Sequence, residues 1–378
     1  MKGFIDPTPN IPVDAAEFLS FLDLSPLSAT LEKFYSESWR SRHPPKAMLK
    51  LLSLYKLKHY SFLTQLWREL DDRTVRLLGF KWKPSYKTVW HWLNKRIGPQ
   101  GLETIHAALI QAINQALAVQ GVRLGKRASG DATPIEAKLN DKEAAYNGYY
   151  KEHCYLVHRL VCCTTNLTLQ WFVTPGNVDE GKLMVPMLVK AIVNGVSPEE
   201  AAFDNGYAWY VNYEVLGLMG IRPLIGFREK AKPSWRGKPK TLKLRYRKMV
   251  KAGVLIAQKL EELGMSPDPE LNGLEDVVYG LAIAGQHEYV GAYYKNQSWD
   301  ELCRDEHGWL EPYCFMRSVV EGCHGHQKDW LGLDDLKAKG LSKAMLHTAL
   351  CMLSEAVVAY TRVQHTVAKA LTSHAFIR

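Results

Sequence analysis

The fold class of this chain is decided by the stretch HCYLVHRLVCCTTNLTLQWFVTPGNV, residues 153–178. It holds two runs rich in Val, Leu, Thr and aromatic residues, separated at Asn166 and ended by Pro175 and Gly176. Such runs, bounded by turn residues, are typical of consecutive β-strands. A similar short run, KRASGDAT (126–133), comes before them, so we expect three successive strands.

After these strands the patterns alternate between helix and strand, over residues 180–195, 201–204, 210–220 and 222–225. The order β-β-β-α-β-α-β predicts an α/β fold with a mixed sheet flanked by helices. Residues 228–312 begin with a strongly basic tract and interrupt this pattern, which indicates an insertion into the α/β domain. A long amphipathic helix is expected over residues 342–371.

The first third of the chain has helical periodicity. Apolar residues recur three and four apart in the segments 15–24, 44–70 and 102–120. We therefore predict two domains, an all-α domain over residues 1–122 and an α/β domain over residues 123–378.

Within the first domain, residues 71–98 read as a helix, a Pro-containing turn and a basic, aromatic helix, which is the order of a helix-turn-helix. The second helix would offer DNA the side chains Lys87, Trp90, His91, Trp92, Lys95 and Arg96. The alternative is structural: Trp90 and Leu93 face the core and the charged residues are solvated.

The bulk composition favours a polyanionic partner, because the formal net charge is +9 and the pI is about 9.0. The basic tract adds the candidate DNA contacts Arg236, Lys238 and Lys240, with Trp235 and Tyr246 able to stack on bases; a solvated loop is the alternative. The seven cysteines form no CxxC pair, which argues against a disulfide framework. With neither a signal-peptide pattern nor a membrane-length apolar run, we expect a cytoplasmic protein.

Three acids suggest a site. Asp131 and Asp204 fall at the ends of predicted strands, and ligands of open α/β sheets bind at strand ends. Either aspartate could instead be a helix cap or a turn former. Mg²⁺ prefers oxygen ligands, and two such ions at a phosphodiester need about three acids. Glu321, in SVVEGCHGHQKDWLG (318–332), supplies the third if its helix crosses the same sheet edge.

The surroundings of Glu321 carry a resemblance. Arg317 precedes it with three residues between, and Lys328 follows with six between. This spacing resembles the Tyr, Arg, Glu, Lys motif of DDE transposases of bacterial and archaeal insertion sequences. Tyr313 departs from it, because it lies one position too early and Cys314 stands in the expected place.

Further segments resemble the same family and extend the resemblance over about residues 20–365. They are HPPKAMLKLLSLYKL (43–57), ELDDRTVRLLGF (69–80), PSYKTVWHWLNKRIG (84–98), SGDATPIEA (129–137), GYYKEHCYLVHRLV (148–161), TPGNVDEGKLMVPML (174–188) and FDNGYAWYVNYEVLGLMGIRPLI (203–225).

The resemblance implies a ribonuclease-H-like catalytic domain preceded by a helical domain for DNA binding or dimerisation. Asp131, Asp204 and Glu321 would be the catalytic residues and would hold two Mg²⁺ ions, with Mn²⁺ as a substitute. Water or a DNA 3′-hydroxyl would attack in cleavage and strand transfer. Arg317, Lys328 and, more weakly, Tyr313 would contact double-stranded DNA at the terminal inverted repeats. A homodimer in a synaptic complex, associated with the nucleoid when bound, is the implied assembly.

Three alternatives stay open at this point. A different ribonuclease-H-like DNA nuclease would share the metal chemistry, and a non-catalytic DNA-binding transposase relic would share the helical domain, although all three acids are present. A structural zinc site could use Cys303, His307, Cys314, Cys323, His324 and His326, but their spacing matches no zinc finger.

Overall fold

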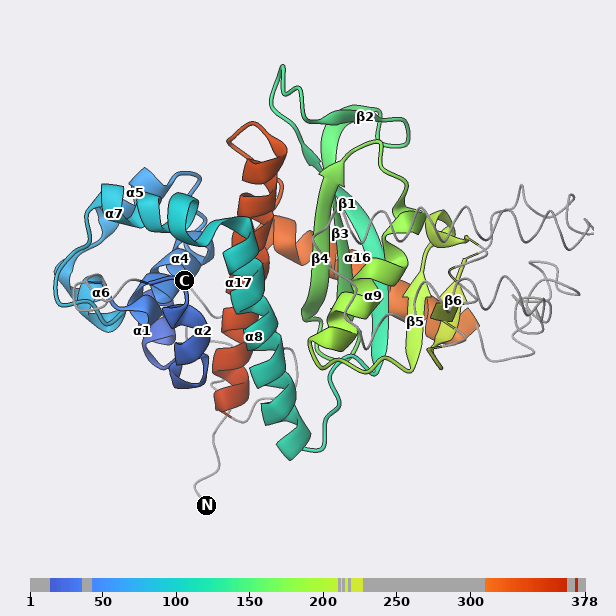
Figure 1. The fold of residues 1–378 in the computed structure, drawn as a ribbon, viewed down its shortest axis with the longest axis horizontal. Coiled ribbons are helices and arrows are strands. Elements are labelled where there is room, and N and C mark those ends of the chain that lie inside the picture. Colours follow the sequence, from blue (N-terminus) through green and yellow to red (C-terminus); the bar gives the residue numbers. More distant parts are fainter. Residues whose placement is uncertain are drawn as a thin grey trace, which may run out of the picture.

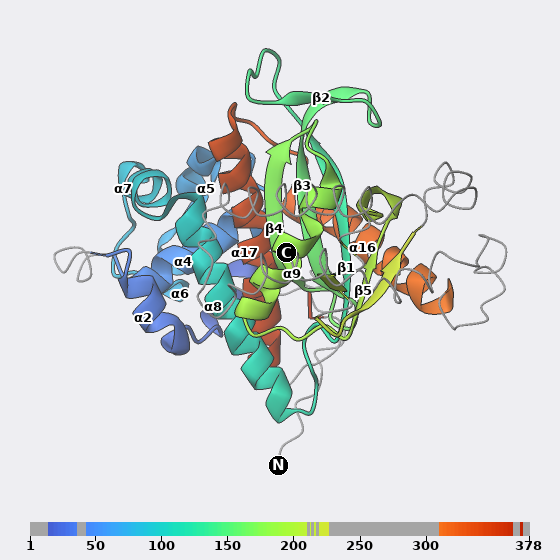
Figure 2. The same cartoon turned by 45° about the vertical axis from the view of Figure 1, so that its right-hand side comes forward.

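The computed structural model describes residues 14–35, 43–209, 212, 215–216, 219–226, 310–365 and 371–372. Figures 1 and 2 show helices packed against a twisted sheet, with N-terminal helices at one side of the molecule. The predicted insertion, residues 228–312, lies almost entirely outside the described residues.

A six-stranded mixed sheet forms the centre of the α/β part. Its strands are β1 (Arg127–Glu136), β2 (Ala145–Asn147), β3 (Glu152–Cys162), β4 (Thr168–Pro175), β5 (Glu200–Phe203) and β6 (Arg222–Ile225). β1 and β4 pair with β3 antiparallel, and β5 pairs parallel with both β1 and β6. This order, with short β2 also on β3, is compatible with a ribonuclease-H-like fold.

The strands were predicted closely, with two differences. β2 was not expected, and β1 extends to Glu136 instead of ending at Asp131. β1 continues because β3 pairs with it as far as Glu136 opposite Cys154, whereas its parallel partner β5 stops earlier. An antiparallel partner of this length could not be read from the short segment 126–133.

The described helices and short helical turns before the sheet confirm helical character in the first third of the chain. They are α1 (Ala15–Ser20), η1 (Ser25–Leu27), α2 (Ser28–Glu32), α4 (Pro45–Leu57), α5 (Leu63–Glu69), α6 (Asp72–Leu77), α7 (Tyr86–His91), η2 (Trp92–Ile97) and α8 (Gly98–Val119). The single helix expected over residues 44–70 is wrong, because the chain turns at His59, whose φ is 55°. Hydrogen bonds from the Lys58 and Tyr60 backbone N–H groups to Leu54 and Tyr55 close the end of α4 there.

Helices cover both faces of the sheet. On one face lies α9 (Met184–Val193), preceded by η3 (Glu180–Lys182), and on the other lie α16 (Leu310–Leu331) and α17 (Leu341–Gln364). The short helix η4 (Asn205–Tyr207) follows β5. α16 crosses β1, β5 and β6, which carries residues 317–328 over the strands that bear the aspartates.

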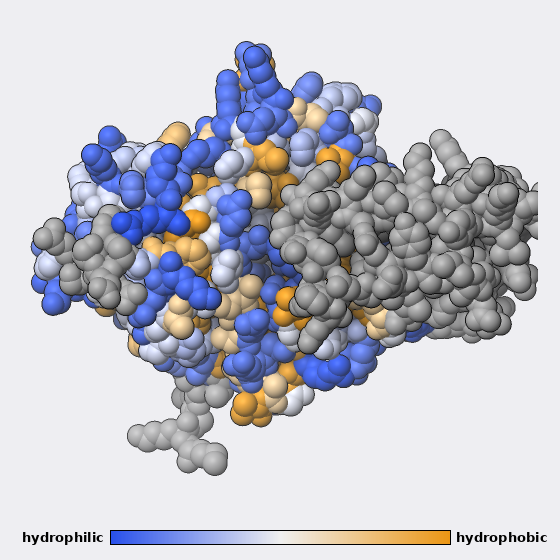
Figure 3. All heavy atoms as spheres, viewed as in Figure 1, coloured by the Kyte–Doolittle hydropathy of each residue, from blue (hydrophilic) through white to orange (hydrophobic). Residues whose placement is uncertain are grey.

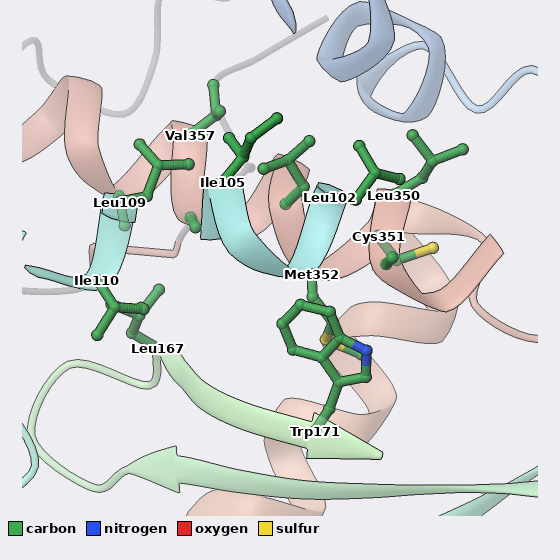
Figure 4. Packing of buried hydrophobic residues seen from close by; sticks show 14 of the residues in the cluster. Leu102, Ile105, Leu109, Ile110, Leu167, Trp171, Leu350, Cys351, Met352 and Val357 are labelled. Carbon is green, nitrogen blue, oxygen red and sulfur yellow. The ribbon is translucent and has the colours of Figure 1, made fainter. Parts of the chain in front are cut away.

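The apolar core is continuous between the N-terminal helices and the sheet. α8 packs along α17, and Figure 4 shows buried side chains of the two helices, such as Leu102 and Met352, gathered over Leu167 and Trp171 of the sheet layer. α17 is long and apolar enough to cross a membrane, but most of it is buried inside the protein, as in the central helix of a soluble protein. In the view of Figure 3 the described surface is mainly hydrophilic, with small separate apolar patches. The division at residue 122 stays a prediction.

A buried ion pair ties α16 and α17 to the sheet. Arg159 on β3 and Glu355 on α17 are both fully buried, with 3.3 Å between Arg159 Nη2 and Glu355 Oε1. Arg159 also donates to the Cys323 carbonyl on α16 at 2.9 Å, and Gln327 on α16 donates to Glu355 at 2.7 Å. Buried charges need such partners, so this network fixes where α16 lies on the sheet.

Candidate active site

Asp131 and Asp204 lie side by side on neighbouring parallel strands. The ladder between β1 and β5 ends with Gly130 opposite Phe203, and the two aspartates are the next residues on each chain. Asp204 begins the loop after β5, at the edge where ligands of parallel strands bind, whereas Asp131 lies inside β1, which continues to Glu136. The strand register thus places the two acids next to each other, although only Asp204 stands at a strand end as predicted.

Asp204 also has a local structural role. It caps η4, and its Oδ1 accepts a hydrogen bond from the backbone N–H of Gly206 at 2.6 Å. The turn-forming alternative considered for this aspartate is thus present in the structure. It does not compete with a site role, because a carboxylate has a second oxygen and several lone pairs.

Arg317 on α16 brings Asp131 and Glu321 together. Its Nη2 lies 2.9 Å from Asp131 Oδ2 and 3.5 Å from Glu321 Oε1, and its Nη1 donates to the Gly130 carbonyl at 3.1 Å. The two carboxylates therefore surround one guanidinium nitrogen. Asp131 and Arg317 are largely shielded, whereas 65% of the Glu321 side chain is exposed.

The surroundings of Asp131 disfavour the ionised form of its carboxyl group. Burial raises the pKa of this carboxyl, the Arg317 guanidinium opposes that rise, and the charge of Asp204 adds to it. Two carboxylates in a low-dielectric setting repel each other, so the pair favours a cation between or beside them.

Glu180 joins these acids although the sequence reasoning did not select it. A Cβ atom built on Gly206 would lie 2.8 Å from both Asp204 Oδ1 and Glu180 Oε2, so the two carboxylates meet at this glycine. Burial, followed by the charges of Asp204 and Asp131, raises the pKa of Glu180 to about 7. Its place follows from the strand directions. β4 runs the same way as β1 and β5, so the segment after β4 reaches the same edge of the sheet.

Tyrosines surround the carboxylates. Tyr207 is fully buried, and burial together with the charges of Glu180 and Asp131 raises its pKa. Tyr150 donates to the Ala132 carbonyl at 3.3 Å. A Cβ built on Gly226 would lie 2.8 Å from the Tyr313 hydroxyl, so this tyrosine reaches from α16 to the end of β6.

His324 and Lys328 follow Arg317 and Glu321 on α16 at separations of three and four residues, so all four side chains share one face of the helix. Burial and the neighbouring Arg159 and Arg317 lower the pKa of His324 well below its usual value. His324 is therefore neutral, and its 4.0 Å approach to Asp131 is not an ion pair. Lys328 lies one turn further along the helix and is half-buried.

The oxygen-rich donor set of the carboxylates fits a hard divalent cation. Within the described ranges, no three His, Cys, Asp or Glu side chains already converge as a complete metal site. Arg317 stands beside Asp131 and Glu321, so metal binding would require rearrangement of these side chains. Of the alternative zinc set, Cys303 and His307 lie outside the described residues; Cys323 is buried and Cys314 exposed on α16.

The structure gives the exposure of the predicted DNA contacts in the helix-turn-helix segment. Lys95 is exposed and Arg96 half-buried on η2. Trp92 is fully buried, so it cannot contact DNA as predicted, while Trp90 is 38% exposed. The structural alternative was right for Leu93 and wrong for Trp90, because Trp92 supplies the core contact instead, beside Tyr35. Arg236, Lys238 and Lys240 lie outside the described residues.

Comparisons with known proteins add little. No family model matches the chain. No curated protein matches it. Among solved structures it is similar to a cryo-EM structure of the piggyBac transposase synaptic complex with hairpin DNA. That likeness has 12% sequence identity and a TM-score of 0.30, and covers 96% of this chain and 84% of the other.

Proposed function

We propose that this protein is a DNA transposase that uses two divalent metal ions to cleave DNA at transposon ends and to join those ends to target DNA. The observation that supports the proposal is that Asp131 has Asp204 beside it on the neighbouring strand and shares the Arg317 guanidinium with Glu321 of the crossing helix. The motif resemblance around Glu321 points to the same chemistry.

In this proposal Asp131, Asp204 and Glu321 hold the metal ions. Bound Mg²⁺ would activate the attacking oxygen and stabilise the leaving oxygen of the phosphodiester. Only 15% of the Asp131 side chain is exposed, and shielding from water strengthens the attraction between an ionised carboxylate and a cation.

Arg317 serves two roles in the proposal. In the protein alone it offsets the negative charge of Asp131 and Glu321. With DNA bound, its fork of donors would face a backbone phosphate, while Lys328 would add a point charge further along α16. A guanidinium forms charge-assisted hydrogen bonds with carboxylates and with phosphates, so Arg317 can exchange one partner for the other.

The proposed partner is double-stranded DNA, at terminal inverted repeats and at the target. The net charge of +9 supports a polyanionic partner. A homodimer in a synaptic complex is part of the proposal, since two ends must be joined in one event. The exposed Lys95 and the neighbouring Arg96 are proposed to contact the DNA backbone.

The test uses DNA that flanks the gene and carries candidate inverted repeats. Wild-type protein should cleave these ends with Mg²⁺ and transfer them to a second duplex. Asp131→Asn, Asp204→Asn and Glu321→Gln should each abolish cleavage while end binding is retained. Cleavage without strand transfer would instead identify a nuclease, and binding without either activity would identify a non-catalytic relic.

A further inference from the structure

We propose that Glu180 is a fourth carboxylate of this site and holds a divalent cation jointly with Asp204. The inference rests on the proposed function for the identity of the metal chemistry. It concerns a residue that the three-acid motif does not include.

Geometry supports the pairing of these two residues. Asp204 Oδ1 and Glu180 Oε2 both lie within 2.8 Å of the position that a Cβ on Gly206 would take. A side chain larger than hydrogen at position 206 would therefore collide with both carboxylates. The absence of a side chain at Gly206 leaves room for both oxygens beside this one backbone position.

Hydrogen bonds fix the position of the short helix that carries Glu180. Asp179 accepts a hydrogen bond from the Gly181 backbone N–H at 2.9 Å and so caps η3. Asn212 donates to the Gly181 carbonyl at 2.9 Å and to the Tyr207 carbonyl at 2.9 Å, which joins η3 to η4. Glu180 and Asp204 therefore lie on two short helices that one amide ties together.

A buried hydroxyl points to a ligand at the same place. Tyr207 is fully buried, and its hydroxyl has no hydrogen-bond partner among the residues that the structure describes. The carboxylates of Glu180, Asp131 and Asp204 all lie close enough to act on it. An unsatisfied buried donor is unfavourable, so we expect a ligand oxygen to accept this hydrogen.

Charge balance also favours a cation. Asp131, Asp204, Glu180 and Glu321 are four acids, and Arg317 is the cation that the described residues place against them. His324 beside Asp131 is neutral, and Tyr150, Tyr207 and Tyr313 contribute no positive charge. When all four acids are ionised, Arg317 neutralises only one of the four negative charges, and divalent cations can neutralise the rest.

The inference is tested by direct Mn²⁺ binding to the full chain without DNA, measured by isothermal titration calorimetry. Glu180→Gln should weaken Mn²⁺ binding at least about tenfold, since even outer-shell partners of metals change affinity by about 10- to 100-fold. Glu180→Asp keeps the carboxylate and should lose less. The matched control is Glu136→Gln, an exposed acid at the end of the same strand as Asp131, which should bind Mn²⁺ like the wild type.

A second readout does not depend on calorimetric heat. Mn²⁺ should raise the thermal unfolding midpoint of the wild type and of Glu136→Gln, and raise that of Glu180→Gln by less. Removal of a repelled carboxylate leaves the metal-free fold intact, which circular dichroism checks.

The outcomes separate this inference from the proposed function. If Asp204→Asn loses Mn²⁺ binding and Glu180→Gln retains wild-type affinity, Glu180 is not a ligand, while the three-acid site stands. If the wild type binds no Mn²⁺ by either readout, both fail.

Discussion

Gly130→Ala should destabilise the sheet at the point where the two aspartates begin. A Cβ at residue 130 would lie 2.0 Å from Phe203 Cε1 and 2.6 Å from Cδ1, whereas ordinary contact begins at 3.4 Å. The ring would have to retreat by about 1.4 Å, the difference between 3.4 and 2.0 Å. It has little room, because Phe203 is fully buried and its ring lies 5.0 Å from that of Tyr207.

Overpacking of this kind costs about 1–3 kcal/mol. The free energy of unfolding, from urea titration followed by circular dichroism, measures it. Gly148→Ala is the matched control, because a Cβ there meets nothing within 4 Å and no positive φ is involved. That control should stay within about 0.5 kcal/mol of the wild type.

The same change should reach the site, because Phe203 directly precedes Asp204. Displacement of β5 from β1 should weaken Mn²⁺ binding under conditions where the variant is fully folded. A second substitution, Phe203→Leu, should recover part of the lost stability in the Gly130→Ala background by removing ring atoms. Equal stability of Gly130→Ala and Gly148→Ala would refute the reasoning, since it would mean that the strands are not packed this closely.

Three further predictions concern the buried network, pH and DNA. Arg159→Met should lower the free energy of unfolding by about 3–5 kcal/mol, because it leaves the buried Glu355 without its cationic partner; a urea titration that shows no loss would contradict this. In EDTA, the pKa of Glu180, raised to about 7 from its usual 4.5, should make its contribution to stability fullest below about pH 4.5 and lost as the pH rises through 7. Unfolding titrations should accordingly show a smaller decline between pH 5 and pH 8 for Glu180→Gln than for the wild type, and parallel pH profiles would be inconsistent with the burial of this acid. Lys328→Ala should reduce the slope of log affinity against log salt for end DNA by about 0.9, and an unchanged slope would exclude a phosphate contact.

Arg317 shows how the structure adds to a sequence prediction. The motif spacing suggested that this side chain reaches DNA phosphates. In the protein alone it is bound to Asp131 and the Gly130 carbonyl, with Glu321 at 3.5 Å. Spacing along a helix gives the side on which a residue lies, but the partner on that side comes from another part of the chain.

The sequence by itself determined the positions and chain order of the main strands, because each is a run of β-favouring residues ended by turn residues. It also singled out three separated acids as candidate site residues, since each stands beside a recognisable local pattern. It did not separate 44–70 into two helices, because the turn at His59 depends on backbone hydrogen bonds and not on a Gly or Pro signal.

Only the tertiary structure decided which side chains surround those acids. Glu180 reaches Asp204 because β4 and β5 end at the same edge and because Gly206 leaves space, and neither fact is visible in the local sequence around Glu180. The same holds for Trp92, which takes the core position expected of Trp90. Local patterns arise from interactions between near neighbours, whereas these contacts join residues far apart in the chain and exist only once the strands and helices have packed.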